Sequence, residues 1–218
     1  MPEWWTYRPS DFLMFEPETY YRLFELYNRH VWPAQVVAVL LGLMLVALAW
    51  QSRQSSVWPG RVAAAILMLA WLWVAWAFHW RRYATINLAA GYVAAAYAIQ
   101  AVLLSPALRR PILFRPAPHK PDPIGIGVAL FGLLFQPLLG PLQGRGWAQI
   151  ELFGLAPDPT VTATLGILLA GAGSWVLFVI PLLWCVATGA TLWAMGAADA
   201  WVMPALGLLV VGRAVWRK

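Results

Sequence analysis

Two histidines carry the side chain best suited to chemistry in this sequence, because imidazole nitrogens bind transition metals and the iron of haem. His30 stands just before the first long apolar run and His79 ends the second one, so both are expected on the same side of a membrane. No third histidine joins them there, and the chain has a single cysteine, Cys185. The pattern favours two polar interfacial histidines, with a metal or haem site as the weaker alternative. No cofactor is predicted.

A second group of polar residues lies in the stretch from Gln136 to Asp158, whose prolines and glycines are expected to prevent a regular helix. Broken helices at membrane depth line wet cavities and build the sites of many transporters. The plainer interpretation is a loop at the outer surface with a short turn from Trp147 to Phe153. We favour that loop, because Arg145 and Glu151 prefer water and lie close enough in sequence to pair.

Patterns typical of enzymes are missing from the sequence. No Ser-His-Asp order, pair of catalytic carboxylates or HExxH spacing can be assembled. No charged residue is expected near the middle of a bilayer, where ionisable groups usually mark proton relays and ion pathways. The sequence therefore argues against an enzyme and against a proton-driven pump, and leaves open a passage for a neutral or weakly polar solute.

Composition places these residues in a membrane protein. Of 218 residues, 61% are apolar and 11% are charged, against about 45–50% and about 25% in soluble domains. The only lysines, Lys120 and Lys218, lie outside the apolar runs, which excludes a retinal Schiff base within the bundle. The net charge of +6 comes from basic residues that flank apolar runs, as orienting charges do. Nucleic acid is therefore not an expected partner.

The apolar runs predict an all-α, polytopic transmembrane helical bundle of about seven helices. Each run has about the length needed to cross ~30 Å of hydrocarbon, although the fifth is short. The seven runs are Ala34–Trp50, Val62–Trp80, Ile86–Leu104, Ile124–Leu139, Pro159–Ala170, Trp175–Met195 and Ala200–Trp216. Six spans are the alternative, if the fifth is only re-entrant. Asp158 and Asp199 are expected to cap the helices that follow them.

Loop charges predict the orientation. With seven spans, nine arginines and lysines lie on the side of the C-terminus and six on the other side. The positive-inside rule then places the C-terminus in the cytoplasm.

The amino-terminal segment, residues 1–33, is expected to be separate from the bundle of residues 34–218. Glu18, Arg22, Glu25 and Arg29 are spaced four, three and four apart, which aligns alternating charges along one stripe of a helix. Aromatic residues, among them Tyr20 and Tyr27, cover the rest of its circumference. The pattern predicts an amphipathic helix that anchors at the interface. A lid over a cavity in the outer half of the bundle is the alternative.

Two further faces could bind a solute or pack another helix. Trp73, Trp76 and Trp80 form a stripe that is typical of an aromatic belt, with a binding wall as the minority interpretation. Asn87 begins a face of small residues on the third run that predicts close helix packing, with Asn87 bonding to a neighbouring helix.

Two further segments are distinctive: Trp4–Phe15, with the sequence WWTYRPSDFLMF, and Phe153–Thr160, with the pattern FGxxPxPT. Both resemble segments of an uncharacterised bacterial family of multi-pass membrane proteins, a domain of unknown function. The resemblance implies the same architecture in a bacterial inner membrane and supplies no activity.

We therefore expect binding or transport of a small solute through a site on the outer side of the bundle. The candidate residues are Tyr20, Tyr27, His30, Trp76, His79, Asn87, Gln136, Glu151 and Asp158. The expected partners are membrane lipids and a small neutral solute. The alternative is a non-catalytic subunit or scaffold that forms a homo-oligomer or joins partner membrane subunits.

Overall fold

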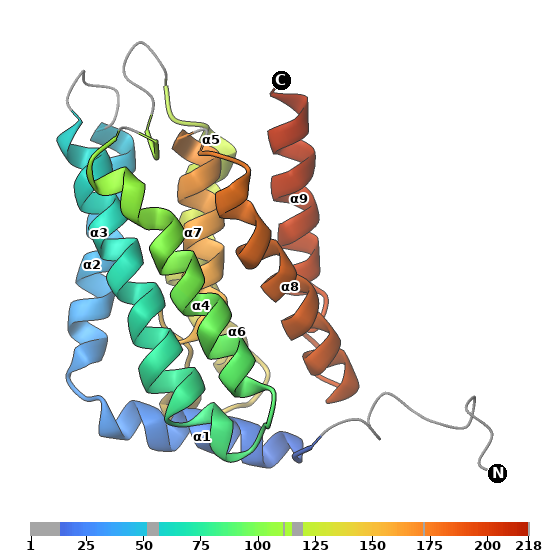
Figure 1. Ribbon diagram of the computed structural model, residues 1–218. Coiled ribbons are helices and arrows are strands. Elements are labelled where there is room, and N and C mark those ends of the chain that lie inside the picture. The colour runs from blue at the N-terminus through green and yellow to red at the C-terminus, as the bar shows by residue number, and fades with distance from the viewer. Residues whose placement is uncertain (1–13, 52–56, 111, 115–119, 172, 218) are drawn as a thin grey trace.

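The computed structural model describes residues 14–51, 57–110, 112–114, 120–171 and 173–217. Within them the chain is all-α, and α1 (Pro17–His30) lies across one end of a helical bundle while α9 (Val202–Trp216) ends at the other (Figure 1). The remaining bundle elements are α2 (Ala34–Gln51), α3 (Trp58–Trp73), the π-helix η3 (Val74–Trp80), α4 (Ala90–Leu104), α5 (Pro123–Leu130), the π-helix η6 (Phe131–Phe135), α6 (Gln136–Leu142), α7 (Pro157–Gly171) and α8 (Val176–Ala194).

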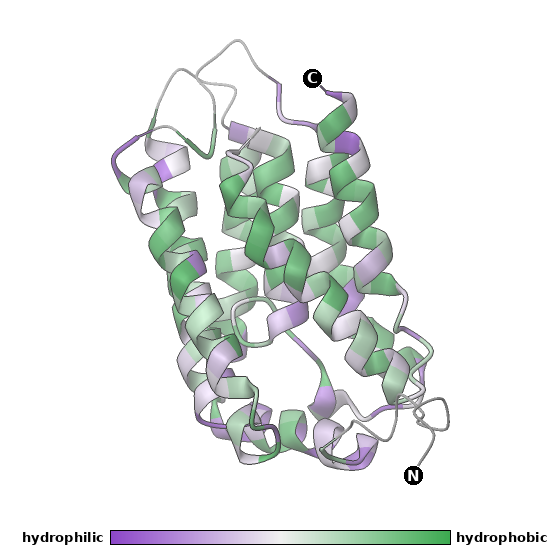
Figure 2. Ribbon diagram, turned by 45° about the vertical axis from the view of Figure 1, so that its right-hand side comes forward, coloured by the Kyte–Doolittle hydropathy of each residue, from purple (hydrophilic) through white to green (hydrophobic). Residues whose placement is uncertain are grey.

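Five helical segments are long and apolar enough to cross a membrane, and α9 is a shorter apolar helix. The five are Ala34–Gln51, Trp58–Thr85, Ala90–Leu108, Pro123–Leu142 and Val176–Ala194. Hydrophobic residues run along the bundle helices and hydrophilic ones gather mostly at the two ends (Figure 2). The predicted membrane bundle is therefore confirmed as a fold class.

The fourth span shows one error of the sequence reasoning. The helix continues through Pro137 to Leu142, with Pro141 inside it, so the expected irregular stretch begins only after Leu142. The π-helix η6 directly precedes Gln136 and Pro137. Proline lacks the N–H that an α-helix needs, and the wider turn of η6 relaxes the hydrogen-bond register just before it.

The short helix α7 is enclosed by protein, because every residue from Pro157 to Ala170 is buried. It packs backbone to backbone against α5. A Cβ added to Gly125 would lie 2.4 Å from the nitrogen of Ala170, and one added to Gly166 would lie 2.4 Å from the nitrogen of Ala129. Small residues at these positions permit an approach that larger side chains would prevent.

This packing fixes the depth at which α7 begins. Gly125 meets Ala170, and Gly132 meets Thr162, so the two segments are antiparallel. The same register places the first residue of α7 level with about residue 137, roughly five residues, or ~8 Å, short of the end of α6. Residues 143–156 must therefore return into the bundle before α7 starts.

The helix α1 packs onto the end of the bundle. Phe24 and Tyr27 are each 1% exposed and belong to the same hydrophobic cluster as the bundle helices. The ring centroids of Phe24 and Phe78 are 4.9 Å apart. Burying a large apolar side chain stabilises by about 1.5–3 kcal/mol, so these contacts stabilise the packed position of α1.

The polar side of α1 confirms the predicted charge stripe. Glu25 pairs with Arg22 and with Arg29, each at 2.6 Å. On its inner side, the Asn28 side chain donates to the carbonyl oxygens of Ala148 and Ile150, at 3.0 and 2.8 Å. These bonds tie α1 to the segment 143–156 directly.

The opposite end of the bundle is fastened by Asp122, whose side chain is 1% exposed. It accepts from the backbone nitrogen of Ile124 and so caps α5. It also pairs with Arg213 at 2.9 Å and with Arg217 at 3.3 Å. One carboxylate thus links the start of α5 to the end of α9, a contact that the sequence analysis missed.

Candidate functional site

Three of the predicted residues, Gln136, Glu151 and Asp158, line one small cavity beneath α1. Its volume is about 20 Å³, which is room for about one water molecule. Nine residues line it: Gln136, Leu139, Arg145, Glu151, Asp158, Leu192, Asp199, Val202 and Met203. They come from α6, the segment 143–156, the first turn of α7, the end of α8, the turn that holds Asp199 and the start of α9.

Arg145 is the centre of the cavity's charge. One guanidinium nitrogen lies 2.8 Å from Asp199 Oδ2 and another lies 3.8 Å from Glu151 Oε1. The guanidinium carbon also lies 4.6 Å from the centre of the Tyr21 ring, so α1 covers it. The side chains of Arg145, Glu151 and Asp199 are only 12%, 15% and 9% exposed.

The expected surface loop is therefore wrong for these residues. Arg145 and Glu151 do form the anticipated pair, but inside the protein. They avoid water because each charge meets an opposite one there, which offsets much of the cost of burial. The short turn does exist, as the 3-10 helix η7 (Trp147–Gln149), and Trp147 on it is exposed.

Asp158 is buried, but it does not cap α7, although the sequence analysis predicted that it would. Its two oxygens accept from Trp184 Nε1 at 2.6 Å and from Thr188 Oγ1 at 3.0 Å. Trp184 stands near the middle of α8, so this carboxyl group lies well inside the bundle. Asp199 likewise caps nothing in the described structure, because Arg145 engages it instead.

Charge within this cluster is unbalanced. Three carboxyl groups surround one guanidinium, so ionised carboxylates would outnumber the cation. Burial raises the pKa of Glu151 above its ordinary value; the Asp158 charge adds to the effect, and Arg145 opposes it. The cluster therefore holds a proton at Glu151 more tightly than water-exposed glutamate does.

Several polar atoms at the cavity have no hydrogen-bond partner within the described structure. They are Gln136 Oε1, Glu151 Oε2, Asp199 Oδ1 and Arg145 Nε. Buried polar groups are nearly always paired, and an unpaired one costs about 1–3 kcal/mol. Gln136 donates through its other side-chain atom to the sulfur of Met203, at 3.2 Å. The cavity thus offers an occupant two acceptors, the donor Arg145 Nε, and Glu151 Oε2, which donates while Glu151 holds its proton.

The two histidines lie in different environments. His79 is fully buried, with ring centroids of Tyr97 and Trp184 at 4.5 and 5.2 Å, and neither ring nitrogen has a hydrogen-bond partner among the described residues. His30 is exposed at the end of α1. Among the residues that the structure describes, no three His, Cys, Asp or Glu side chains form a group that could hold a metal ion.

The aromatic candidates divide between the underside and the edge of α1. Tyr20 is buried against Tyr83, with ring centroids 5.9 Å apart. Tyr27 accepts from Trp73 Nε1 at 2.9 Å, and burial raises the pKa of Tyr27 to about 12. Trp76 is exposed and lines a groove together with Tyr27 and His30.

Asn87 stands apart from all of these. It donates to Tyr83 Oη at 2.8 Å and accepts from the backbone nitrogen of Ala89, also at 2.8 Å. The expected bond to a neighbouring helix is wrong, because α4 begins at Ala90 and leaves Asn87 in the turn before it. On the small-residue face behind it, Ala94 and Ala101 are buried as predicted.

Comparison with known proteins gives one match. The model of a family of unknown function, DUF6064, matches residues 17–218. The chain belongs to this family. No curated protein and no solved structure matches it.

Membership of DUF6064 supports the resemblance to a family of unknown function but not the two motifs that carried it. The first motif begins before the matched range, and its residues 4–13 also lie outside the described residues. With five helices that could cross a membrane, this DUF6064 protein is a multi-pass membrane protein.

Proposed function

We propose that this protein binds or transports a small polar solute, which enters the cavity around Arg145 from the end of the bundle that α1 covers. One observation carries the proposal. Polar atoms of Gln136, Glu151 and Asp199 are buried, have no hydrogen-bond partner among the described residues, and gather around a small cavity. A protein that only needed a stable bundle would lose free energy by keeping them there.

The architecture around the cavity supports the proposal. Helix α7 starts inside the bundle, and its first turn borders the cavity. Helices that begin at membrane depth, with irregular backbone leading into them, recur at transporter sites. The π-helix η6 ends next to Gln136, and such turns are frequent at functional sites.

The free atoms indicate the chemistry of the solute. Gln136 Oε1 and Asp199 Oδ1 accept hydrogen bonds, Arg145 Nε donates, and Glu151 Oε2 donates while Glu151 holds its proton. A solute with both donors and acceptors complements this set, as a small amide or polyol does. The cavity is too small for such a molecule, so α1 must move, and it acts in this proposal as the lid.

The proposal also places the protein in the bacterial inner membrane with its C-terminus in the cytoplasm. The positive-inside rule supports that orientation. In that orientation the cavity opens toward the outer side of the membrane. Several of the charges counted for it, including Arg8, Arg53, Arg115 and Lys218, lie outside the described residues.

One observation favours the alternative of a non-catalytic subunit or scaffold. A cavity of about 20 Å³ leaves this part of the described bundle nearly filled, as a protein that only supports partner subunits would be.

Solute uptake into proteoliposomes separates the two functions. Thr19 of α1 and Thr85 line one groove, so Thr19→Cys and Thr85→Cys in a Cys185→Ser background allow α1 to be cross-linked with a bifunctional thiol reagent. Light scattering should show faster swelling in urea or glycerol than for protein-free liposomes, and the cross-link should abolish the difference. Swelling no faster than in protein-free liposomes for every solute would favour the scaffold.

A further inference from the structure

A second binding feature lies outside the buried cavity, at the edge of α1. It is a groove of about 460 Å³ between α1 and the end of η3. Its lining consists of Tyr27, His30, Val31, Trp73, Trp76, Ala77, Arg81 and Arg82. The residues divide by chemistry into an aromatic and apolar part and a part with two arginines.

The aromatic part places this groove at the surface of a membrane. It lies at the end of the span Trp58–Thr85. Trp76 and Trp80 are 56% and 60% exposed on that span. Exposed tryptophans at the end of a span typically lie at the level of the lipid head groups. The groove therefore opens where head groups and the first part of the acyl chains are found.

The two arginines have no counter-charge among the described residues, whereas Arg145 meets Asp199 and Arg213 meets Asp122. Arg81 and Arg82 form no ion pair within the described part of the chain, and the groove's lining contains no Asp or Glu there. Their positive charge is free to meet an anion from outside.

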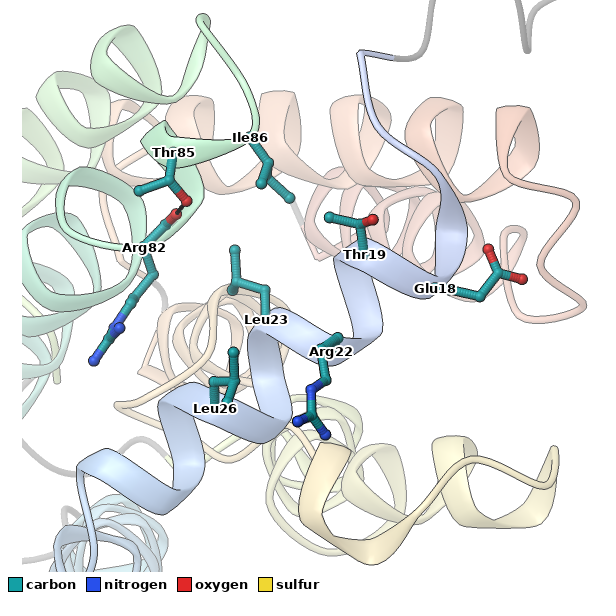
Figure 3. A pocket seen from close by; sticks show the side chains of 8 residues that line it. All are labelled: Glu18, Thr19, Arg22, Leu23, Leu26, Arg82, Thr85 and Ile86. Carbon is teal, nitrogen blue, oxygen red and sulfur yellow. Dashed lines mark hydrogen bonds between the residues drawn. The ribbon is translucent and has the colours of Figure 1, made fainter.

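The groove on the other side of Arg82 differs in charge. Its volume is about 430 Å³, and Figure 3 shows Arg82 and Thr85 across from Leu23 and Leu26, with Glu18 at the far end from Arg82. That lining also contains Arg22, but Arg22 pairs with Glu25 at 2.6 Å. With Glu18 as a further carboxylate there, the groove of Arg81 and Arg82 is the better site for an anion.

We propose that the groove of Tyr27, Trp76, Arg81 and Arg82 binds the phosphate group of an anionic glycerophospholipid. The guanidinium groups would bind phosphate oxygens, which match their planar arrangement of donors. Trp73, Trp76 and Ala77 would contact the glycerol and the upper acyl chains. Because the groove lies against α1, a bound lipid also braces the helix that covers the buried cavity.

Native mass spectrometry of the detergent-purified protein tests the proposal, with phosphatidylglycerol and phosphatidylcholine as probes. A basic residue near a membrane surface contributes about 1 kcal/mol toward an anionic lipid. Removing two should therefore weaken phosphatidylglycerol binding about 30-fold. We expect this loss in Arg81→Gln/Arg82→Gln. The lysine pair Arg81→Lys/Arg82→Lys should keep most of the affinity, which separates loss of charge from loss of fold.

A matched control is available at the other end of the bundle. Arg109 and Arg110 are also adjacent and exposed, so Arg109→Gln/Arg110→Gln should keep the preference for phosphatidylglycerol. Equal binding of the two lipids by the unchanged protein would overturn the proposal, and so would a preference that survives Arg81→Gln/Arg82→Gln. Displacement of the lipid by millimolar inorganic phosphate would show a site for free anions and would also contradict it.

Discussion

The pair Arg145–Asp199 gives the most discriminating prediction about the buried cavity. Arg145→Met removes the donor that lies 2.8 Å from Asp199 Oδ2, and Asp199 Oδ1 already has no partner. The carboxylate would then be buried with neither oxygen bonded. Breaking a buried ion pair from one side costs about 3–5 kcal/mol, and we expect a loss of that size in the free energy of unfolding.

The second arm of the experiment is a double-mutant cycle. Asp199→Asn keeps an acceptor for Arg145, which also retains Glu151 at 3.8 Å, so it should cost about 1–2 kcal/mol. In Arg145→Met/Asp199→Asn no charge of the pair is left. The double variant should therefore be more stable than Arg145→Met alone, with a coupling energy near 2 kcal/mol.

Unfolding of the detergent-solubilised protein by sodium dodecyl sulfate, followed by tryptophan fluorescence, measures these energies. Arg22→Met is the matched control, because Arg22 also pairs with a carboxylate but is 55% exposed on the outer face of α1. It should change stability far less than Arg145→Met does. Equal effects of the two single variants, or strictly additive losses in the cycle, would refute the buried pair.

Three further predictions concern the same fold. The pKa of Glu151 is raised in the folded state, so its contribution to stability is fully present below the ordinary glutamate pKa of ~4.3 and is lost as pH rises through the folded-state pKa. The melting temperature should therefore fall as pH rises, and Glu151→Gln should flatten that fall. An unchanged pH profile in Glu151→Gln would argue against a buried acid. Gly125→Ala should destabilise the protein by about 1–3 kcal/mol, because its Cβ would lie 2.4 Å from a backbone nitrogen. Gly127→Ala on the same helix meets open space and should be neutral or stabilising. A comparable loss of stability in both variants would contradict the close packing of α5 on α7. Asp122→Asn should lower stability by about 1–2 kcal/mol, because Arg213 and Arg217 lose their shared charge partner but remain partly exposed to water, and a melting temperature equal to that of the unchanged protein would show that this contact is not formed.

Features that depend on neighbouring residues could be predicted from the sequence. The spans follow from runs of apolar residues, and the charge stripe of α1 follows from the spacing of Glu18, Arg22, Glu25 and Arg29. The structure adds what this pattern could not give, the side onto which α1 packs. That choice depends on contacts such as Phe24 with Phe78, which join separate elements.

The buried charges could not be predicted in the same way. Arg145 and Asp199 are 54 residues apart, and Asp122 and Arg213 are 91 apart, so no local pattern links them. Preference for water made the surface the reasonable expectation for Arg145. Only the return of residues 143–156 into the bundle brings it to Asp199. A useful signal was present in α7, where three buried threonines, Thr160, Thr162 and Thr164, indicate a polar interior.

Access to the cavity from the α1 end is the central claim, and thiol labelling measures it most directly. Val202 lines the cavity and is buried, so Val202→Cys in the Cys185→Ser background should react with a small water-soluble thiol reagent in proteoliposomes. In the variant that also carries Thr19→Cys and Thr85→Cys, the Val202→Cys thiol is first protected reversibly while the other two cysteines are cross-linked. Once the protection is removed, the cross-linked α1 should prevent the reaction of Val202→Cys. A Val202→Cys thiol that reacts at the same rate with α1 free or cross-linked, or that never reacts, would contradict the account.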